Sequence, residues 1–341
     1  MLELYNFSQS TCSLKVRIAL EEKGLEWVDK RLVSKDHDHL SDWYLKLNPN
    51  GVVPTLLHDG RPVIESSVIM QYIDQLSPEP PLMPADPYDQ ATLRAWLVYV
   101  DLVTTPASRF PSFQYGGLRI KFQALTQEEF DEKTNKRPVK SGFYKKMSKE
   151  NGFPPDVMDA AFRDLRATVE RMDQMLADTG GPWLMGEQFT IADIAVAPLI
   201  DRNEDIGFEY LWEENHPRVA EWLSAIQARP SFQRAYYHGC RLSEIYPELK
   251  LGRGAHRHVL DPSAAVPASA VPGEAARSAP SRGRRQPPQP AQASHRKFAP
   301  PMSANRSISR LCVPGAMRLR NVRPIQLPGI MITPTASPSR T

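Results

Sequence analysis

The stretch Asn50–Ser66, NGVVPTLLHDGRPVIES, decides the fold of the first part of the chain. Two short apolar segments, Thr55–Leu57 and Pro62–Ile64, flank an Asp-Gly pair, which predicts a β-hairpin. The Val-Pro step before the first segment makes a cis peptide bond accessible and removes one backbone donor. Glu65 and Ser66 then place a carboxylate and a hydroxyl at the exposed N–H groups of a helix start. This arrangement suits a peptide-sized ligand, and it equally fits a plain hairpin followed by a capped helix.

The segments around the hairpin complete a small sheet. Upstream, residues 2–7 and 27–33 alternate as strands, with a helix predicted at 14–23, stopped by Gly24, and another at 39–47. Downstream, apolar residues at helical spacing run from Ser66 to Leu76. A strand, a crossover helix and a second strand imply a parallel pair, and the hairpin adds antiparallel partners. Residues 1–77 are therefore predicted to form an α/β domain with a four-stranded mixed sheet.

The second half of the folded region has only helical periodicity. Five prolines in residues 78–87 predict a linker. Apolar stripes over 88–103, 162–176 and 215–228 predict that residues 88–245 are all-α. At Thr190, a threonine followed three residues later by Asp193 predicts an N-terminal capping box. Residues 116–155 are charged and poorly periodic, so we expect a loop or short helices over the cleft between the two domains.

Composition changes at Gly252. From there to Thr341 there are 14 Lys and Arg against two Asp and Glu, which leaves 28 against 37 in residues 1–251. Fourteen of these 90 residues are Pro and no apolar periodicity remains. Such a segment buries too little apolar surface to offset ordering entropy, so residues 252–341 are predicted to be a disordered Pro/Arg-rich tail. Its basic residues lack interleaved aromatics, so we do not expect this tail to bind nucleic acid. An inert extension is the alternative interpretation.

Cysteine usage and hydropathy indicate the compartment. The chain has three cysteines, Cys12, Cys240 and Cys312, which do not suggest a disulfide framework. It opens without a secretory signal, and no stretch approaches the ~20 apolar residues of a membrane span. We therefore expect a cytoplasmic protein with no membrane partner and no metal site.

The order of these motifs resembles the cytosolic glutathione S-transferases. Four features carry the resemblance over residues 1 to about 240: the βαβ–ββα order, Val-Pro before the third strand, Glu-Ser at the third helix, and the Thr-x-x-Asp box of an all-α part. The resemblance implies a thioredoxin-like glutathione-binding domain at 1–77 and a helical C-terminal domain at 88–245. It also implies a homodimer that uses glutathione as cosubstrate.

The same resemblance assigns the glutathione contacts. The backbone of Val53, preceding a cis Pro54, would pair with the cysteinyl part of glutathione. Glu65 and Ser66 would hold the γ-glutamyl end. His39, at the start of the second helix, matches by position the side chain that contacts the glycyl end.

The group that activates glutathione is expected in the turn Ser10-Thr11-Cys12-Ser13. It must stabilise a thiolate, and the pKa of a free thiol is near ~8.5, so a hydroxyl donor at a helix N-terminus is suitable. Ser10 matches the activating serine of the zeta class, the maleylacetoacetate isomerases. Ser13 resembles the serine of the bacterial β-etherases, and Cys12 the cysteine of the beta class, which forms a mixed disulfide with glutathione. Ser10 and Ser13 rank together ahead of Cys12; Ser13 also fits a helix N-cap, and Cys12 a small buried residue.

Two branches of the family remain open. Segments 41–43, 48–51, 85–87 and 151–154 are similar to the β-etherases, and the 116–155 insertion is foreign to compact zeta enzymes. The resemblance implies a transferase, of a family linked to detoxification, whose thiolate attacks an electrophilic or aryl-ether substrate. The alternatives are a glutathione-dependent cis–trans isomerase and a non-catalytic dimerisation or ligand-carrying module.

The acceptor is expected to be a small hydrophobic or aromatic electrophile. The helix after the linker should face the first domain across the cleft, so aromatic residues on it and beyond it are candidates for the pocket. Each of them also fits an ordinary core position. The candidates are Tyr99, Phe110, Phe113 and Tyr115.

Overall fold

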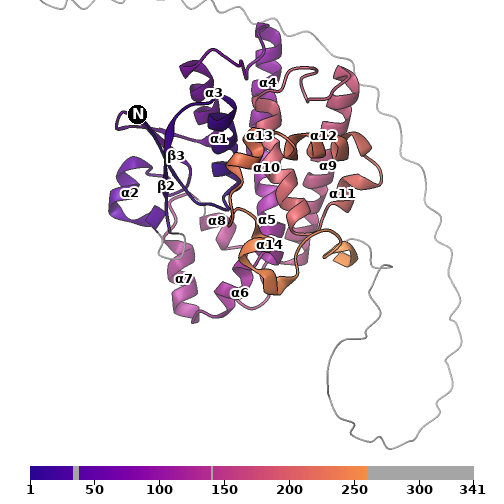
Figure 1. Cartoon of the computed structure of the whole chain (residues 1–341). Coiled ribbons are helices and arrows are strands. Elements are labelled where there is room, and N and C mark those ends of the chain that lie inside the picture. The colour runs from indigo at the N-terminus through magenta and orange to yellow at the C-terminus, as the bar shows by residue number, and fades with distance from the viewer. Residues whose placement is uncertain (34–37, 140, 260–341) are drawn as a thin grey trace, which may run out of the picture. The chain divides into compact units, whose positions relative to one another are not determined.

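The structure is a computed structural model, and it describes residues 1–33, 38–139 and 141–259. The N-terminal part is a sheet with helices beside it (Figure 1). Its elements are β1 (Leu2–Asn6), α1 (Thr11–Glu22), β2 (Trp27–Arg31), the 3-10 helix η2 (Asp38–Leu40), α2 (Asp42–Leu47), β3 (Thr55–His58), β4 (Arg61–Ile64) and α3 (Ser66–Leu76).

The sheet has the strand order β2-β1-β3-β4. β1 and β2 are parallel, and β3 is antiparallel to both β1 and β4. Between β3 and β4, Asp59 and Gly60 have φ angles of 49° and 78°. Both lie in the left-handed region, as the tight turn of a two-residue hairpin requires. The predicted hairpin and the four-stranded mixed sheet are therefore confirmed.

Helix α1 begins three residues earlier than the periodicity predicted. Ser10 has an extended backbone, and its hydroxyl accepts a hydrogen bond from the Ser13 N–H at 3.3 Å. A serine in this position satisfies one of the free N–H groups of the first turn, so the polar residues after it join the helix. Similarly, Ser41 has a ψ of 151°, and this extended residue divides the predicted 39–47 helix into η2 and α2.

Among the described residues of the C-terminal part, all the regular elements are helices, and the β-structure is limited to isolated bridges. Its helices are α4 (Pro87–Tyr99), the π-helical segment η3 (Val100–Thr104), α5 (Thr105–Tyr115), α6 (Leu118–Gln123), α7 (Gln127–Asn135), α8 (Ser141–Tyr144), α9 (Pro155–Thr179), α10 (Ile191–Asp205), α11 (Tyr210–Glu213), α12 (Pro217–Gln227), α13 (Pro230–Ala235), α14 (Leu242–Ile245), and the 3-10 helices η4 (Pro247–Leu249) and η5 (Arg257–Val259). The described part of the chain contains no helix both long enough and apolar enough to cross a membrane.

The predicted helix at 88–103 is part of a longer rod. α4 continues through η3 into α5, and Pro106 lies at the junction between η3 and α5. Because proline has no N–H, it removes one i to i−4 hydrogen bond, and a π-helical segment is one way in which a helix absorbs such a defect. The 116–155 region was predicted to be either a loop or short helices. It contains the three short helices α6, α7 and α8.

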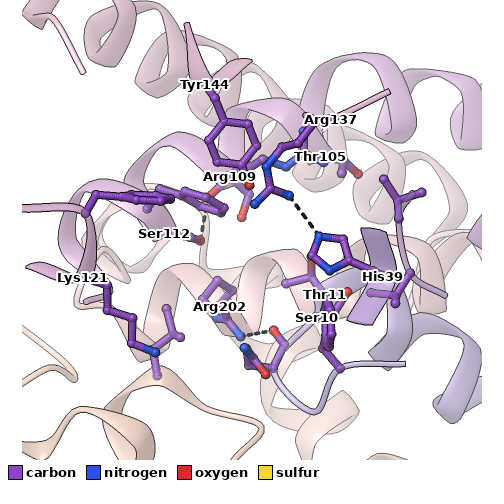
Figure 2. Close-up of a pocket in the computed structure, with 18 of the residues that line it drawn as sticks. Ser10, Thr11, His39, Thr105, Arg109, Ser112, Lys121, Arg137, Tyr144 and Arg202 are labelled. Carbon is purple, nitrogen blue, oxygen red and sulfur yellow. Dashed lines mark hydrogen bonds between the residues drawn. The ribbon is translucent and has the colours of Figure 1, made fainter. Parts of the chain in front are cut away.

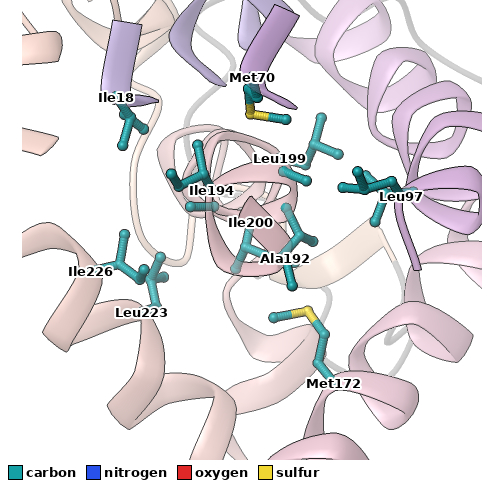
Figure 3. Close-up of a cluster of buried hydrophobic side chains, with 14 of the residues drawn as sticks. Ile18, Met70, Leu97, Met172, Ala192, Ile194, Leu199, Ile200, Leu223 and Ile226 are labelled. Atoms are coloured by element: carbon teal, nitrogen blue, oxygen red, sulfur yellow. The ribbon is translucent and has the colours of Figure 1, made fainter. Parts of the chain in front are cut away.

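Helix α10 lies at the centre of the core and is buried on all sides (Figure 3). Helices α4, α5 and α12 surround it, and α1 of the sheet part packs against it as well. The capping box at its start is present as predicted: the Thr190 hydroxyl accepts from the Ala192 N–H at 3.2 Å, and the Asp193 carboxylate accepts from the Thr190 N–H at 3.0 Å. Since α1 rests on this helix, α10 fixes the position of the first turn of α1.

The folded part extends beyond the predicted boundary at Gly252. Arg253 pairs with Glu204 at 2.7 Å and also with Glu213, and the His256 ring stacks on Phe208 at 5.4 Å. These contacts use acidic and aromatic groups of the helical part, which the composition of the tail alone does not reveal. The remainder of the predicted tail, 260–341, lies outside the described residues.

Candidate active site

A cavity of about 380 Å³ lies between the sheet part and the helical part (Figure 2). The loop after β1, the first turn of α1, His39 and the loop before β3 supply one wall. Helix α5 and the segments of the 116–155 insertion supply the other, and Arg202, Leu242 and Tyr246 complete the lining. The predicted short helices of the insertion therefore do border the cleft.

Ser10 and Thr11 bring the N-terminus of α1 to this cavity. The turn is closed by the Ser10 N–H, which donates to the Phe7 carbonyl at 3.2 Å. Helix N-termini carry a partial positive charge, so an anion near Ser10 is stabilised both by the hydroxyl and by the helix. Of the three candidates for thiol activation, Ser10 is the one that lines the cavity.

Ser13 and Cys12 lie elsewhere. Ser13 is fully buried, and its hydroxyl has no hydrogen-bond partner among the described residues. Cys12 is half-buried and is a free cysteine. Neither side chain is part of the cavity wall. In this structure Ser13 contributes to the helix cap through its backbone N–H, which donates to the Ser10 hydroxyl.

The Val53-Pro54 peptide bond is cis, and Val53 lines the cavity while Pro54 does not. The preceding carbonyl, of Val52, accepts hydrogen bonds from the Tyr44 hydroxyl at 2.7 Å and from the Asn48 amide at 2.9 Å. Tyr44 and Asn48 are both completely buried. They hold the backbone before Val53 in place, so that it forms a fixed edge beside Ser10.

His39 lines the same cavity and contacts the insertion. Its Nε2 lies 3.1 Å from a guanidinium nitrogen of Arg137, and the Arg137 guanidinium also lies 4.1 Å from the centre of the Tyr144 ring. Figure 2 shows these three side chains together at one side of the cavity. Because a guanidinium only donates hydrogen bonds, His39 Nε2 accepts in this contact, so the pair places one positive charge, that of Arg137, at this side of the cavity.

Glu65 and Ser66 occupy the start of α3, outside this cavity. Glu65 has a φ of 68°, which is rare for a residue with a side chain, and its carboxylate accepts from the Asn50 amide at 3.0 Å. Ser66 is buried. Backbone strain of this kind costs of order 1–3 kcal/mol and is concentrated at functional sites.

One of the four predicted acceptor aromatics, Phe113, lines the cavity. Tyr99 stacks on Trp96 with ring centres 5.5 Å apart. Phe110 lies 5.0 Å from Phe143 in an aromatic cluster, and Tyr115 packs against Phe208 at 5.3 Å. These three rings therefore pack against other aromatic side chains and do not line the cavity. This is the alternative in which each of them is an ordinary core residue.

The sequence analysis missed the cationic character of the cavity. Its lining includes five Lys or Arg residues and one histidine but no Asp or Glu: Arg109, Lys121, Lys133, Arg137, Arg202 and His39. Arg202, on α10, is buried and donates to the Gln9 carbonyl at 2.8 Å, so it supports the loop after β1. The charged character of the insertion was visible in the sequence, but nothing there indicated which side chains face the cleft.

Tyr144 does not offset this positive charge. Burial raises the pKa of the Tyr144 hydroxyl, although Arg137 and Arg109 oppose the shift. The ring is therefore a neutral phenol near neutral pH and presents an apolar face and an O–H group rather than an anion. The described residues bring no three His, Cys, Asp or Glu side chains together as a metal site.

Comparison with known proteins identifies the family. Residues 9–76 match the family model described as glutathione S-transferase, N-terminal domain, and residues 155–225 match that of the C-terminal domain. Protein LigF from Sphingobium sp. strain SYK-6 is 34% identical over 246 residues, which is 69% of this chain and 93% of LigF. This chain belongs to the glutathione S-transferase family.

Two further comparisons place this glutathione S-transferase among its relatives. The crystal structure of beta-etherase LigF from the same strain superposes with a TM-score of 0.62 at 32% identity, covering 69% of this chain and 98% of LigF. Maleylacetoacetate isomerase from Rattus norvegicus is 24% identical over 249 residues, covering 72% of this chain and 96% of the isomerase. The β-etherases and the isomerases are the two branches that the sequence motifs resembled.

Proposed function

We propose that this chain is a cytoplasmic, homodimeric glutathione transferase that activates the glutathione thiolate for attack on an electrophilic or aryl-ether substrate. The observation that carries the proposal is the cavity in which Ser10, Val53 and His39 share one wall. Residues 1–77 bind glutathione, and residues 88–245 supply the acceptor side of the cleft. The resemblance to beta-etherase LigF supports the aryl-ether reaction.

In this proposal each part of glutathione has a partner. The cysteinyl backbone pairs with Val53 before cis Pro54, the γ-glutamyl end binds at Glu65 and Ser66, and the glycyl carboxylate binds beside His39. The thiolate lies at Ser10, where the hydroxyl and the N-terminus of α1 stabilise its charge. It attacks the carbon that bears the aryloxy group, so that a C–S bond forms, the C–O bond breaks, and the aryloxide leaves with the electron pair.

Substitution of Ser66 tests the binding half of this site. Ser66→Ala is expected to weaken glutathione binding about 10-fold, because a hydrogen bond to a charged group of the γ-glutamyl end is lost. Titration calorimetry with glutathione measures the change. Ser224→Ala, at an exposed position of α12, is the matched control and should bind as the wild type does. Absence of binding to the wild-type protein at millimolar glutathione would reject the proposed function.

A second candidate function is a glutathione-dependent cis–trans isomerase. The observation in its favour is that Ser10, which corresponds to the activating serine of the isomerase branch, lines the cavity. In an isomerase the thiolate adds to a double bond and is returned, so glutathione is not consumed. Quantifying glutathione during turnover separates the two reactions. A non-catalytic module would instead bind glutathione without producing the ultraviolet absorbance of a thiolate near neutral pH.

The proposed homodimer uses an exposed apolar face of α3, α4 and η3. Helices α3 and α4 are linked by a hydrogen bond of 3.3 Å from the Arg94 guanidinium to the Gln71 side-chain carbonyl. The exposed apolar side chains are Val68 (53%), Tyr88 (79%), Val98 (57%) and Leu102 (73%). Large apolar side chains that are exposed on neighbouring elements can form an interaction surface.

Leu102→Glu is therefore expected to convert the dimer into a monomer, because a carboxylate would lose its hydration in the apolar interface. Light scattering coupled to size-exclusion chromatography measures the mass. Val139→Glu places the same charge on another exposed apolar position and should leave the dimer intact. A wild-type protein that is already monomeric at micromolar concentration would contradict the assignment of this face.

A further inference from the structure

The cavity is lined by more cationic side chains than glutathione has anionic groups to pair with them. Glutathione has two carboxylates, and in the proposed function the γ-glutamyl one binds at Ser66, outside the cavity. The glycyl carboxylate lies beside His39, where Arg137 is the adjacent cation. The thiolate lies at Ser10, on the opposite wall from α5. Arg109, Lys121 and Lys133 then remain without an assigned anion.

None of these three groups has a close ion-pair partner among the described residues, although Glu129 and Glu132 of α7 lie near enough to Lys133 for its charge to lower their pKa values. Within 1–33, 38–139 and 141–259, no carboxylate forms an ion pair with Arg109, Lys121 or Lys133. The recorded contacts are with aromatic faces: the Arg109 guanidinium lies 5.5 Å from the centre of the Phe143 ring, and the Lys121 ammonium lies 5.1 Å from that of Tyr246. Unpaired cations in a partly enclosed site favour a ligand of opposite charge.

The position of Arg109 is the best defined of the three. It is half-buried on α5, whereas Lys121 is exposed. Three cavity-lining rings pack edge to face beside it: Tyr144 lies 5.8 Å from Phe113 and 6.2 Å from Phe122. Since the Tyr144 hydroxyl remains protonated, this wall combines apolar ring faces with a guanidinium and no negative charge. An arginine in such a setting binds a carboxylate through paired N–H donors.

We propose that the acceptor substrate is an aromatic carboxylate, whose ring packs against Phe113, Phe122 and Tyr144 and whose carboxylate binds Arg109; this rests on the proposed function. Lys121 and Lys133 line the same cavity, and their positive charges help to attract the anion. The carboxylate takes no part in the bond changes: it orients the ring so that the electrophilic carbon faces the thiolate at Ser10. The site thereby selects acidic aromatic acceptors over neutral ones.

A pair of acceptors of similar size and shape, one anionic and one neutral, tests the selection. In chloronitrobenzoate and chloronitrobenzamide, with chlorine ortho to the nitro group, the thiolate forms a C–S bond and chloride leaves with the electron pair of the C–Cl bond. After correction for the uncatalysed rate, kcat/KM for the benzoate is expected to exceed that for the benzamide at least about 10-fold. Arg109→Gln is expected to lower the benzoate value about 10- to 100-fold and to change the benzamide value less than about 3-fold.

Two further variants test whether the preference for the benzoate depends on the positive charge of Arg109. Arg109→Lys keeps the charge and should recover part of the benzoate preference. Arg163→Gln, at an exposed position of α9 outside the cavity, should behave as the wild type does. Circular dichroism melting of each variant establishes that it is folded. Equal use of the two acceptors by the wild type, or an equal loss of both in Arg109→Gln, would overturn the inference.

Binding without chemistry separates this inference from the proposed function. Calorimetry with unreactive nitrobenzoate and nitrobenzamide should give tighter binding of the benzoate to the wild type, a difference that Arg109→Gln removes. Equal affinities would overturn the inference. Calorimetry with S-methylglutathione tests the glutathione site independently, so its failure would reject the proposed function and not the anion site.

Discussion

Replacing Asp193 by Ala is expected to lower the free energy of unfolding by about 3–5 kcal/mol, the largest stability effect of any single change considered for this chain. The Asp193 carboxylate is completely buried and accepts four hydrogen bonds. The donors are the N–H groups of Leu184 and Thr190, at 2.9 and 3.0 Å, the Thr190 hydroxyl at 3.3 Å, and the Trp222 indole at 2.9 Å. They come from the loop before α10, from its first turn and from α12.

Removing the carboxylate leaves buried donors without an acceptor, and each unsatisfied group costs about 1–3 kcal/mol. Burial raises the pKa of the Asp193 carboxyl although the donors oppose it, so the charged form depends on all of them. The effect should reach the active site as well, because α1 packs on α10 and Arg202 of α10 supports the loop before Ser10.

Denaturant unfolding followed by tryptophan fluorescence and by circular dichroism measures this loss. Protein concentration must be held constant, since the stability of the proposed dimer would depend on it. Asp159→Ala, at an exposed position of α9, is the control and should change stability by less than about 0.5 kcal/mol. Trp222→Phe removes a single donor and should cost about 1 kcal/mol or somewhat more. If Asp193→Ala unfolded like the control, the network would contribute nothing measurable.

Features specified by neighbouring residues were predictable from the sequence. The hairpin at Asp59 and Gly60 depends on φ angles that these two residues adopt readily, and the capping box depends on Thr190 and Asp193 three residues apart. The cis bond at Pro54 was anticipated for the same reason: it needs a proline and its immediate neighbour. In each case the physical cause lies within a few residues.

The composition of the cavity was not predictable, because its residues meet only in the folded chain. Arg137 of the insertion reaches His39, and Arg109 of α5 lies on the same cavity, yet no spacing in the sequence relates these positions. Tyr99 and Phe110 were acceptor candidates because the helix after the linker was expected to face the first domain across the cleft. The π-helical segment η3 lies between these two residues, and a π-helical turn alters the direction of the side chains that follow it in a way that the sequence does not reveal.

The first turn of α1 illustrates both cases. The sequence predicted that Ser10-Thr11-Cys12-Ser13 is the reacting turn but left three candidates, because a hydroxyl's direction depends on where the helix begins. In the structure Ser10 is the N-cap and lies on the cavity, while Ser13 is one turn inside the helix and buried. The helix start therefore distinguishes two serines that the sequence ranks together.

Ser10→Ala is accordingly expected to lower kcat about 100- to 1,000-fold, the effect of removing one hydrogen-bond donor to a catalytic anion. Ser13→Ala should change kcat less than about 3-fold, because no hydrogen bond to its hydroxyl is lost among the described residues. Ser10→Ala also removes the N-cap, so Ser10→Gly, which is tolerated at an N-cap and has no side-chain donor, separates the two roles. Ser10→Thr should restore part of the activity.

The thiolate itself provides the second measurement. In the wild type, bound glutathione should show thiolate absorbance near neutral pH, whereas in Ser10→Ala and Ser10→Gly the pKa of the bound thiol should rise towards that of free glutathione, with Kd for glutathione little changed. A large loss confined to Ser13→Ala would instead assign activation to the buried serine and require the turn to open. Trivial effects at both serines would leave Cys12. Exchange of its thiolate with glutathione disulfide gives a mixed disulfide and releases one reduced glutathione, and mass spectrometry of this adduct, abolished in Cys12→Ala, would then identify the cysteine.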